Sequence, residues 1–262
     1  MRDILGNLDT EIHLSDPDPV KRAQKQMRKP LPKRFYKEAK AGEAEGGFAV
    51  LLDGKPVKTP SGERLLFPTS LAAALSAFEY EAQVGEINPS KMPVTRLANT
   101  AVDGVAEQAR EVLADIRLYA SSDLVCYRSE GPEALAELQS LAWDPYLGWA
   151  KSDFGARFFL AQGVMPIEQP AAALDAVGKA LEKYAEPFKA ACLHSMTSLT
   201  GSALVALAVA EGRVTADEAW RDAHVDEDWT ISQWGADEEA MVRRAYRWLE
   251  MKAAADLLRA VS

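Results

Sequence analysis

The three histidines are the first residues to consider for catalysis or metal binding. His13, His194 and His224 are scattered, and none is at metal-ligand spacing with another histidine or with a cysteine. His194 lies in the segment ACLHSMTS, where Ser195 or Ser198 could form the Ser–His pair of a small hydrolase. No GxSxG motif accompanies it, and a lone histidine on a helix is more often structural. A hydrolase that uses this pair is therefore an alternative, not the preferred hypothesis.

Carboxylates are plentiful but give no specific signal of catalysis. Pairs such as Glu79/Glu81 and Glu238/Glu239 could act as acid and base, although most such pairs on helices are simply solvated. The sequence contains no GxxxxGKS/T loop and no GxGxxG segment after a strand, so the known backbone cradles for phosphate are not encoded. We expect no catalytic residue, no cofactor and no metal site.

Polar side chains are concentrated in the segment KMPVTRLANTAVDGV, residues 91–105. It carries Arg96, Asn99, Thr100 and Asp103 among apolar neighbours, without a histidine or cysteine. We interpret it as a polar hinge between a β-rich part and a helical part. Arg96 and Asn99 would satisfy backbone groups or carboxylates there. A share in partner contact is the alternative.

All six tryptophans lie after residue 140. Most are expected to pack in the core or between helices, because aromatic side chains dominate buried area. Trp229 and Trp234 differ, since they interrupt the acidic stretch DEDWTISQWGADEEA. An aromatic residue among charges, next to a glycine, is a reasonable interface anchor. The alternative is that each tryptophan folds back over the last helix.

The composition of the 262 residues is that of a soluble globular protein, with 48% hydrophobic and 26% charged residues. A net charge of −9 argues against a general nucleic-acid binder. The two cysteines, Cys126 and Cys192, are far apart, which favours a reducing compartment over a disulfide framework. No apolar run reaches the ~18 residues of a membrane helix. The N-terminus has no apolar signal region, so we expect a cytoplasmic protein.

Charge is distributed unevenly along the chain. Nine Lys or Arg residues and one acid lie between Pro19 and Lys40, whereas seven acids and no Lys or Arg lie between Asp222 and Glu239. Both segments could be solvated, or one or both could meet a charged partner. A structural adaptor that docks to a membrane surface through the basic segment is a further alternative.

Turn signals predict a β-rich region near the N-terminus. The segment GGFAVLLDGKPVKTPSGERLLFP, residues 46–68, predicts a three-stranded meander with a hairpin at Asp53-Gly54. Pro56 and Pro60 favour an edge strand.

The periodicity changes to that of helices after residue 69. Ser70 is a plausible N-cap, and Leu71, Leu75 and Phe78 fall on one stripe of a helix that stops near Gly85. From about residue 104 the pattern is almost wholly helical. Pro145 is expected to restart or kink the chain. The apolar stripe of the final helix, from about Glu238, consists of Val242, Ala245, Tyr246, Leu249, Ala253 and Leu257.

These patterns predict an α+β fold with three parts. Residues 1–32 form an extended basic arm, because Pro17, Pro19, Pro30 and Pro32 break any long helix. Residues 33–103 form a small β-rich N-terminal domain with one helix. Residues 104–262 form a larger all-α C-terminal domain.

Four sequence blocks resemble a known chaperone family. Taken together and in order, they resemble the assembly chaperones for the α subunit of F-type ATP synthase, known in mitochondria as the Atp-twelve family, which has bacterial relatives. The blocks are RFYK at 34–37, LDGKPVKTPSG at 52–62, EYEAQVGEINPSKMPVTRLANTAVD at 79–103 and ISQWGADEEA at 231–240.

The resemblance implies a two-part fold and a function without catalysis. A protein of this family binds the free α subunit and keeps it soluble until it assembles with β subunits. It needs no nucleotide of its own. The resemblance also implies a bacterial, cytoplasmic member, which we expect to be a monomer when free.

The resemblance assigns the family's critical acid to the residues after a Trp-Gly pair. Here Trp234-Gly235 is followed by Asp237, Glu238 and Glu239, and either of the last two could be that acid. The resemblance also includes a Glu-aromatic pair at the start of the third block; the aromatic residue is often Trp in the family and is Tyr80 here. With the aromatic and hinge residues above, the candidate partner-binding residues are Glu238, Glu239, Asp237, Trp234, Gly235, Trp229, Tyr80, Arg96 and Asn99.

Overall fold

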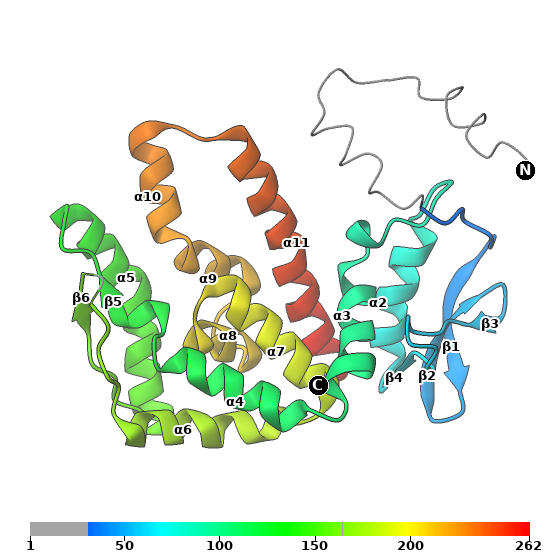
Figure 1. Cartoon of the computed structure of the whole chain (residues 1–262), viewed down its shortest axis with the longest axis horizontal. Helices are drawn as coiled ribbons and strands as arrows, with labels where there is room; N and C mark the ends of the chain where they lie inside the picture. Colours follow the sequence, from blue (N-terminus) through cyan, green and yellow to red (C-terminus); the bar gives the residue numbers. More distant parts are fainter. Residues whose placement is uncertain (1–30, 164) are drawn as a thin grey trace, which may run out of the picture.

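The computed structural model describes residues 31–163 and 165–262. Almost all of the expected arm, residues 1–32, lies outside these ranges, as does His13. The strands of residues 39–67 and their covering helices lie at one end of an elongated molecule, and the remaining helices extend from them (Figure 1). A small strand region is thus followed by a larger helical part, which confirms the predicted α+β class.

The sheet is built around an antiparallel hairpin. Strands β1 (Ala39–Ala44) and β2 (Gly47–Leu52) pair in the register Ala39↔Leu52 to Ala44↔Gly47. Strand β1 was missed by the sequence analysis because its sequence, AKAGEA, has no β-branched or aromatic residue. Pairing with β2 determines its conformation.

Two short strands complete the sheet on the other edge. Asp53 and Gly54 both have positive φ, 48° and 82°, and turn the chain into β3 (Lys55–Pro56), so the predicted hairpin is confirmed. Strand β4 (Leu66–Phe67) pairs with β2, whereas a meander would have paired it with β3. Only the isolated bridge Lys58↔Arg64 follows the expected meander.

Helix α2 (Ser70–Glu81) covers the sheet with its small residues. Its N-cap is Thr69, whose side chain accepts from the Ala72 N–H, and not Ser70. Alanines such as Ala73 and Ala77 are buried, while Leu71 and Phe78 of the predicted stripe are exposed. Small side chains allow a close approach to β1 and β2, so the larger apolar residues are left on the outer face.

The segment predicted to be a hinge is helical. It forms α3 (Pro93–Thr100) and continues into the π-helical turn Ala101–Val105. The buried carboxylate of Glu79 on α2 accepts hydrogen bonds of 2.7 Å from the N–H groups of Val94 and Thr95, at the start of α3. Burial raises the pKa of Glu79, while these hydrogen bonds act in the opposite direction. A second helix thus lies within residues 33–103.

Eight α-helices form the rest of the described chain, with a short parallel pair of strands, β5 (Tyr127–Arg128) and β6 (Ala161–Gln162). The helices are α4 (Ala109–Ala120), α5 (Glu133–Trp149), α6 (Ala171–Leu181), α7 (Pro187–Thr200), α8 (Ala203–Ala210), α9 (Ala216–Ala223), α10 (Val225–Trp234) and α11 (Glu238–Val261). Helix α5 runs through Pro145, where a restart or kink was expected.

The core of the helical part surrounds α7 and α8. Cys192 is buried in it, and Cys126 is buried as well; both cysteines are free. The buried carboxylate of Asp123 accepts from the N–H groups of Val125 and Leu204, and so joins the chain after α4 to the start of α8. Burial raises the pKa of Asp123 to about 6. Within the described ranges, no helix combines the length and apolar character of a membrane span.

The last helix connects the two parts. The second half of α11 is buried and packs against α7, α3 and α2. Thr69 Oγ1 donates to the carbonyl oxygen of Ala260 over 2.6 Å, and Arg96 on α3 is 2.7 Å from Glu250 on α11. These contacts fix the direction in which the first half of α11 extends from the core.

Candidate functional site

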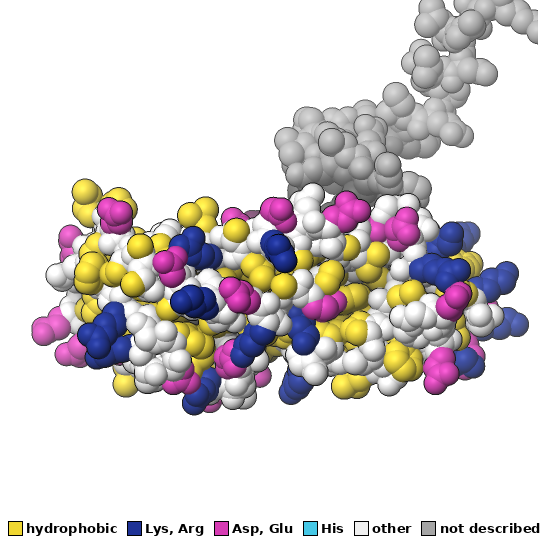
Figure 2. Space-filling model, turned by 90° about the horizontal axis from the view of Figure 1, so that it is seen from below, with side chains coloured by type: hydrophobic (Ala, Val, Ile, Leu, Met, Phe, Trp, Pro, Cys, Tyr) yellow, Lys and Arg dark blue, Asp and Glu magenta, His cyan; other side chains and the backbone are white. Residues whose placement is uncertain are grey.

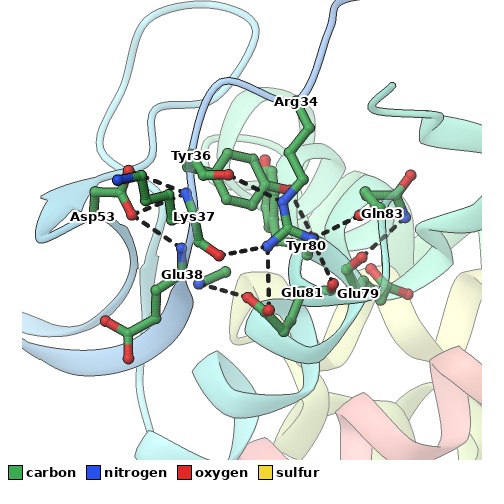
Figure 3. Close-up of polar contacts among 10 residues, drawn as sticks. Arg34, Tyr36, Lys37, Glu38, Asp53, Glu79, Tyr80, Glu81 and Gln83 are labelled. Carbon is green, nitrogen blue, oxygen red and sulfur yellow. Dashed lines mark hydrogen bonds and ion pairs between the residues drawn. The ribbon is translucent and has the colours of Figure 1, made fainter. Parts of the chain in front are cut away.

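Arg34, in the first of the four sequence blocks, joins the chain that enters the sheet to the end of α2 (Figure 3). Its guanidinium donates to the carbonyl oxygens of Tyr36, Lys37, Glu81 and Gln83 at 2.7–3.1 Å, and to Oε1 of Glu81 at 3.1 Å. The carbon of the guanidinium lies 4.6 Å from the centre of the Tyr36 ring. We call this cluster the Arg34 clasp.

Residues of the second and third blocks complete the Arg34 clasp. Asp53 accepts from the N–H groups of Lys37 and Glu38 at 3.0–3.1 Å, and these bonds lower the pKa of its carboxyl. The Tyr36 hydroxyl donates to the carbonyl oxygen of Tyr80 over 2.6 Å. Burial raises the pKa of Tyr80 to about 12. The ring of Tyr80 is half-buried and packs edge-on against Tyr36.

Replacing Arg34 by alanine is expected to lower the free energy of unfolding by about 2–3 kcal/mol, because several charge-assisted hydrogen bonds are lost at a mostly buried site. Arg34→Lys should restore little of this free energy, since an ammonium group cannot reproduce the planar set of guanidinium donors. Urea unfolding followed by circular dichroism measures the free energy of unfolding of both Arg34 variants. The exposed Lys33→Ala is the control. If Arg34→Lys were as stable as the wild type, this role of the Arg34 guanidinium would be contradicted.

Arg96 and Asn99 lie on α3, away from the Trp-Gly pair. Arg96 forms its ion pair with Glu250, so it joins the two parts of the fold. Asn99 Oδ1 is buried and has no hydrogen-bond partner among the described residues, contrary to the expectation that it would satisfy a nearby group. The structure therefore divides the candidate residues between the N-terminal part and the C-terminal helices.

The other candidates lie on two helices that project from the core. We call α10 and the first half of α11, residues 225–250, the α10–α11 arm; the two helices are joined at its outer end (Figure 1). No residue of α10 is buried, and Trp234 at its end is 77% exposed. Gly235, with φ of 87°, allows the chain to leave α10. Trp229 is partly buried and lines a groove between α10 and α5.

The three acids at the outer end differ in their contacts. Asp237 is the N-cap of α11 and accepts from the Ala240 N–H over 2.7 Å. Glu239 lies 3.6 Å from Arg243. Glu238 is exposed, and within the described chain it forms neither a hydrogen bond nor an ion pair. Of the three, Glu238 is the carboxylate that can meet a partner without losing an internal contact.

The predicted apolar stripe of α11 is only half covered. Ala253 and Leu257 are buried, as is usual for the core face of an amphipathic helix. The preceding large residues are 41–56% exposed, and they are Met241, Val242, Tyr246 and Leu249. We call these four residues the α11 stripe. Beside them, Arg244 pairs with Asp228 and holds α11 to α10.

Comparison with known proteins decides the family of the chain. The model of the ATP12 chaperone protein family matches residues 33–151. The Atu1473 protein of Agrobacterium tumefaciens is 52% identical, with a TM-score of 0.86, and the match covers 95% of this chain and 93% of that one. Atp12 from Paracoccus denitrificans is 35% identical, with a TM-score of 0.80, over 88% of this chain and 99% of that one. The chain belongs to the ATP12 chaperone family. It is an assembly chaperone, and these relatives are bacterial.

Basic and acidic side chains are concentrated in different parts of this ATP12 chaperone. Lys and Arg side chains gather at the strand end (Figure 2), where Lys37, Lys55 and Lys58 are exposed. The acids of residues 222–239 lie on and beside the α10–α11 arm. Such separation orients a charged partner during its approach. The basic segment of the membrane-docking alternative falls largely outside the described residues.

His194 forms a pair with a carboxylate, and not with the serine that the hydrolase alternative requires. Its Nε2 lies 2.8 Å from Oδ2 of Asp115, and its ring meets the edge of Tyr119. Among the described residues, neither Ser195 nor Ser198 hydrogen-bonds to His194. The described part of the chain also contains no group of three His, Cys, Asp or Glu side chains placed to hold a metal. The hydrolase alternative therefore lacks, within the described residues, the serine–histidine hydrogen bond on which it depends.

The Arg34 clasp and the exposure of the α11 stripe were not found by sequence reasoning. A sequence signal did exist for the clasp, because its residues fall within three of the four family blocks. For the stripe, the apolar residues were identified, but their exposure depends on where the core ends.

Proposed function

We propose that this ATP12 chaperone binds the free α subunit of F-type ATP synthase and keeps it soluble until β subunits join it. It acts in the cytoplasm as a monomer, without a nucleotide or other cofactor and without catalysis. The observation that carries the proposal is the α11 stripe, an apolar surface next to an acidic helix end in a chain of this family.

The client's chemistry explains why such a surface is needed. A free subunit of an obligate ring exposes a large apolar interface, and an exposed surface of that kind aggregates unless it is covered. The α11 stripe provides apolar contact, while Glu238 and its neighbours favour the approach of a positively charged region. A chaperone that covers the client's apolar interface by contact alone needs no catalytic reaction.

Co-expression of the α subunit with and without the chaperone tests the proposal. We expect more soluble α subunit, and a complex that copurifies in buffers without ATP. The β subunit is the control client and should show neither effect. If no complex forms and soluble α subunit does not increase, the proposed function is wrong.

A further inference from the structure

An open apolar groove of about 810 Å³ lies between α5 and α10. Leu138, Leu141, Pro145 and Trp149 line it from α5, and Trp229 lines it from α10. Leu141 is 77% exposed, so the chain itself leaves this wall uncovered. The volume is within the range of about 300–1,000 Å³ that is usual for binding sites.

The walls of the groove are held in place by polar contacts at its base. The indole N–H of Trp143 donates to the carbonyl oxygen of Asp222 over 2.6 Å, and the Tyr146 hydroxyl donates to Oδ2 of Asp222 over 2.8 Å. Gln139 Nε2 donates to Oδ1 of Asp226 over 2.7 Å. These bonds join α5 to the end of α9 and the start of α10, so the groove exists before any partner binds.

The surroundings of the groove are acidic. The lining arginines are already paired, Arg213 with Asp153 and Arg221 with Asp222. Glu133 and Glu137 line a neighbouring hollow that shares Leu141 and Pro145 with the groove, and Asp226 follows the lining residue Val225. In the part of the chain that the structure describes, none of these three acids has an ion-pair partner. A segment that enters the groove therefore meets apolar walls and an excess of negative charge.

We propose that this groove binds an amphipathic segment of the client, with apolar side chains against α5 and α10 and Lys or Arg at the rim. The charge of the rim selects against an acidic segment, since like charges across an interface are costly. An amphipathic helix in an apolar groove is a common mode of peptide recognition. The inference rests on the proposed function for the identity of the client, but the groove's preference can be tested without it.

The first experiment measures fluorescence anisotropy of two labelled 18-residue helical peptides, one of Leu and Lys and one of Leu and Glu, with the whole protein. We expect the Leu/Lys peptide to bind at least about tenfold more tightly than the Leu/Glu peptide. Leu141→Lys should weaken binding of the Leu/Lys peptide about tenfold. Leu118→Lys on α4, where Leu118 is 66% exposed, makes the same charge change outside the groove and should have little effect.

The second experiment measures the affinity of the same variants for the purified α subunit. If the Leu/Lys peptide binds through Leu141 but the α subunit does not bind, the groove proposal is supported and the proposed client is wrong. If the α subunit binds and Leu141→Lys changes its affinity no more than Leu118→Lys does, the groove proposal is wrong and the proposed function stands. Equal binding of the two peptides also overturns the groove proposal.

Discussion

Replacing Tyr246 and Leu249 together by glutamine is expected to weaken binding of the free α subunit about 100-fold. Both side chains belong to the α11 stripe and are about half exposed in the free chaperone. Truncating a large apolar residue at the centre of an interface costs about 1–2 kcal/mol, and a total of about 2.7 kcal/mol for the two residues corresponds to 100-fold. Because only about half of each side chain is buried within the chaperone, the free energy of unfolding should change by about 1 kcal/mol. Titration calorimetry and urea unfolding measure the two effects.

Leu118 and Leu160 provide the matched control for this double substitution. They are exposed to a similar degree but lie on α4 and on the loop before β6. Leu118→Gln with Leu160→Gln should leave the affinity within about twofold. If both double variants bind alike, the α11 stripe is not the client surface.

Replacing Glu238 by lysine is expected to weaken binding roughly tenfold at low salt, with a smaller effect at high salt. Exposed charges at the edge of an interface act mainly on the association rate and are screened by salt. Glu239→Lys should have a smaller effect, because Glu239 already lies near Arg243. Stopped-flow association of labelled α subunit at two salt concentrations measures the difference.

Glu111 is the matched control for the charge reversal. It is an exposed acid in the first turn of α4, as Glu238 is in the first turn of α11, so lysine has the same small cost at both helix ends. Glu111→Lys should change the association rate only through its effect on the net charge, and therefore less than Glu238→Lys does. Equal effects at the two positions would remove Glu238 from the client surface. Asp237 is unsuitable for this test because its substitution also removes a helix cap.

The β-rich part shows where local signals suffice and where they do not. The Asp53-Gly54 hairpin was predicted because positive φ at both positions has a clear residue preference. Strand β1 was missed because its pairing with β2, and not its own composition, makes it a strand. The apolar stripe identified on α2 is exposed at Leu71 and Phe78, because a 3.6-residue period identifies two faces of a helix without stating which one packs.

Similar reasons explain what could be predicted at the candidate site. Trp234 and the acids that follow it are close in sequence, so their proximity at the junction of α10 and α11 follows from the family block alone. The groove between α5 and α10 brings together Leu141 and Trp229, which are far apart in sequence. No local pattern predicts that juxtaposition, because it depends on how α5 packs against α9 and α10.

The α11 stripe combines both cases. The spacing of Val242, Tyr246 and Leu249 predicted an amphipathic helix, and α11 is a single helix through Val261. The core of the chain ends near Met251, so the same face that is buried at Leu257 is exposed at Tyr246. An unpaired half of a regular amphipathic helix is the pattern that points to a partner.

Light scattering from purified α subunit, diluted from denaturant without nucleotide, tests the central claim most directly. The account predicts that an equimolar amount of the chaperone suppresses aggregation, that added ATP does not change the result, and that the Tyr246→Gln, Leu249→Gln variant fails to suppress it. Aggregation at an unchanged rate with an equimolar amount of wild-type chaperone would contradict the account.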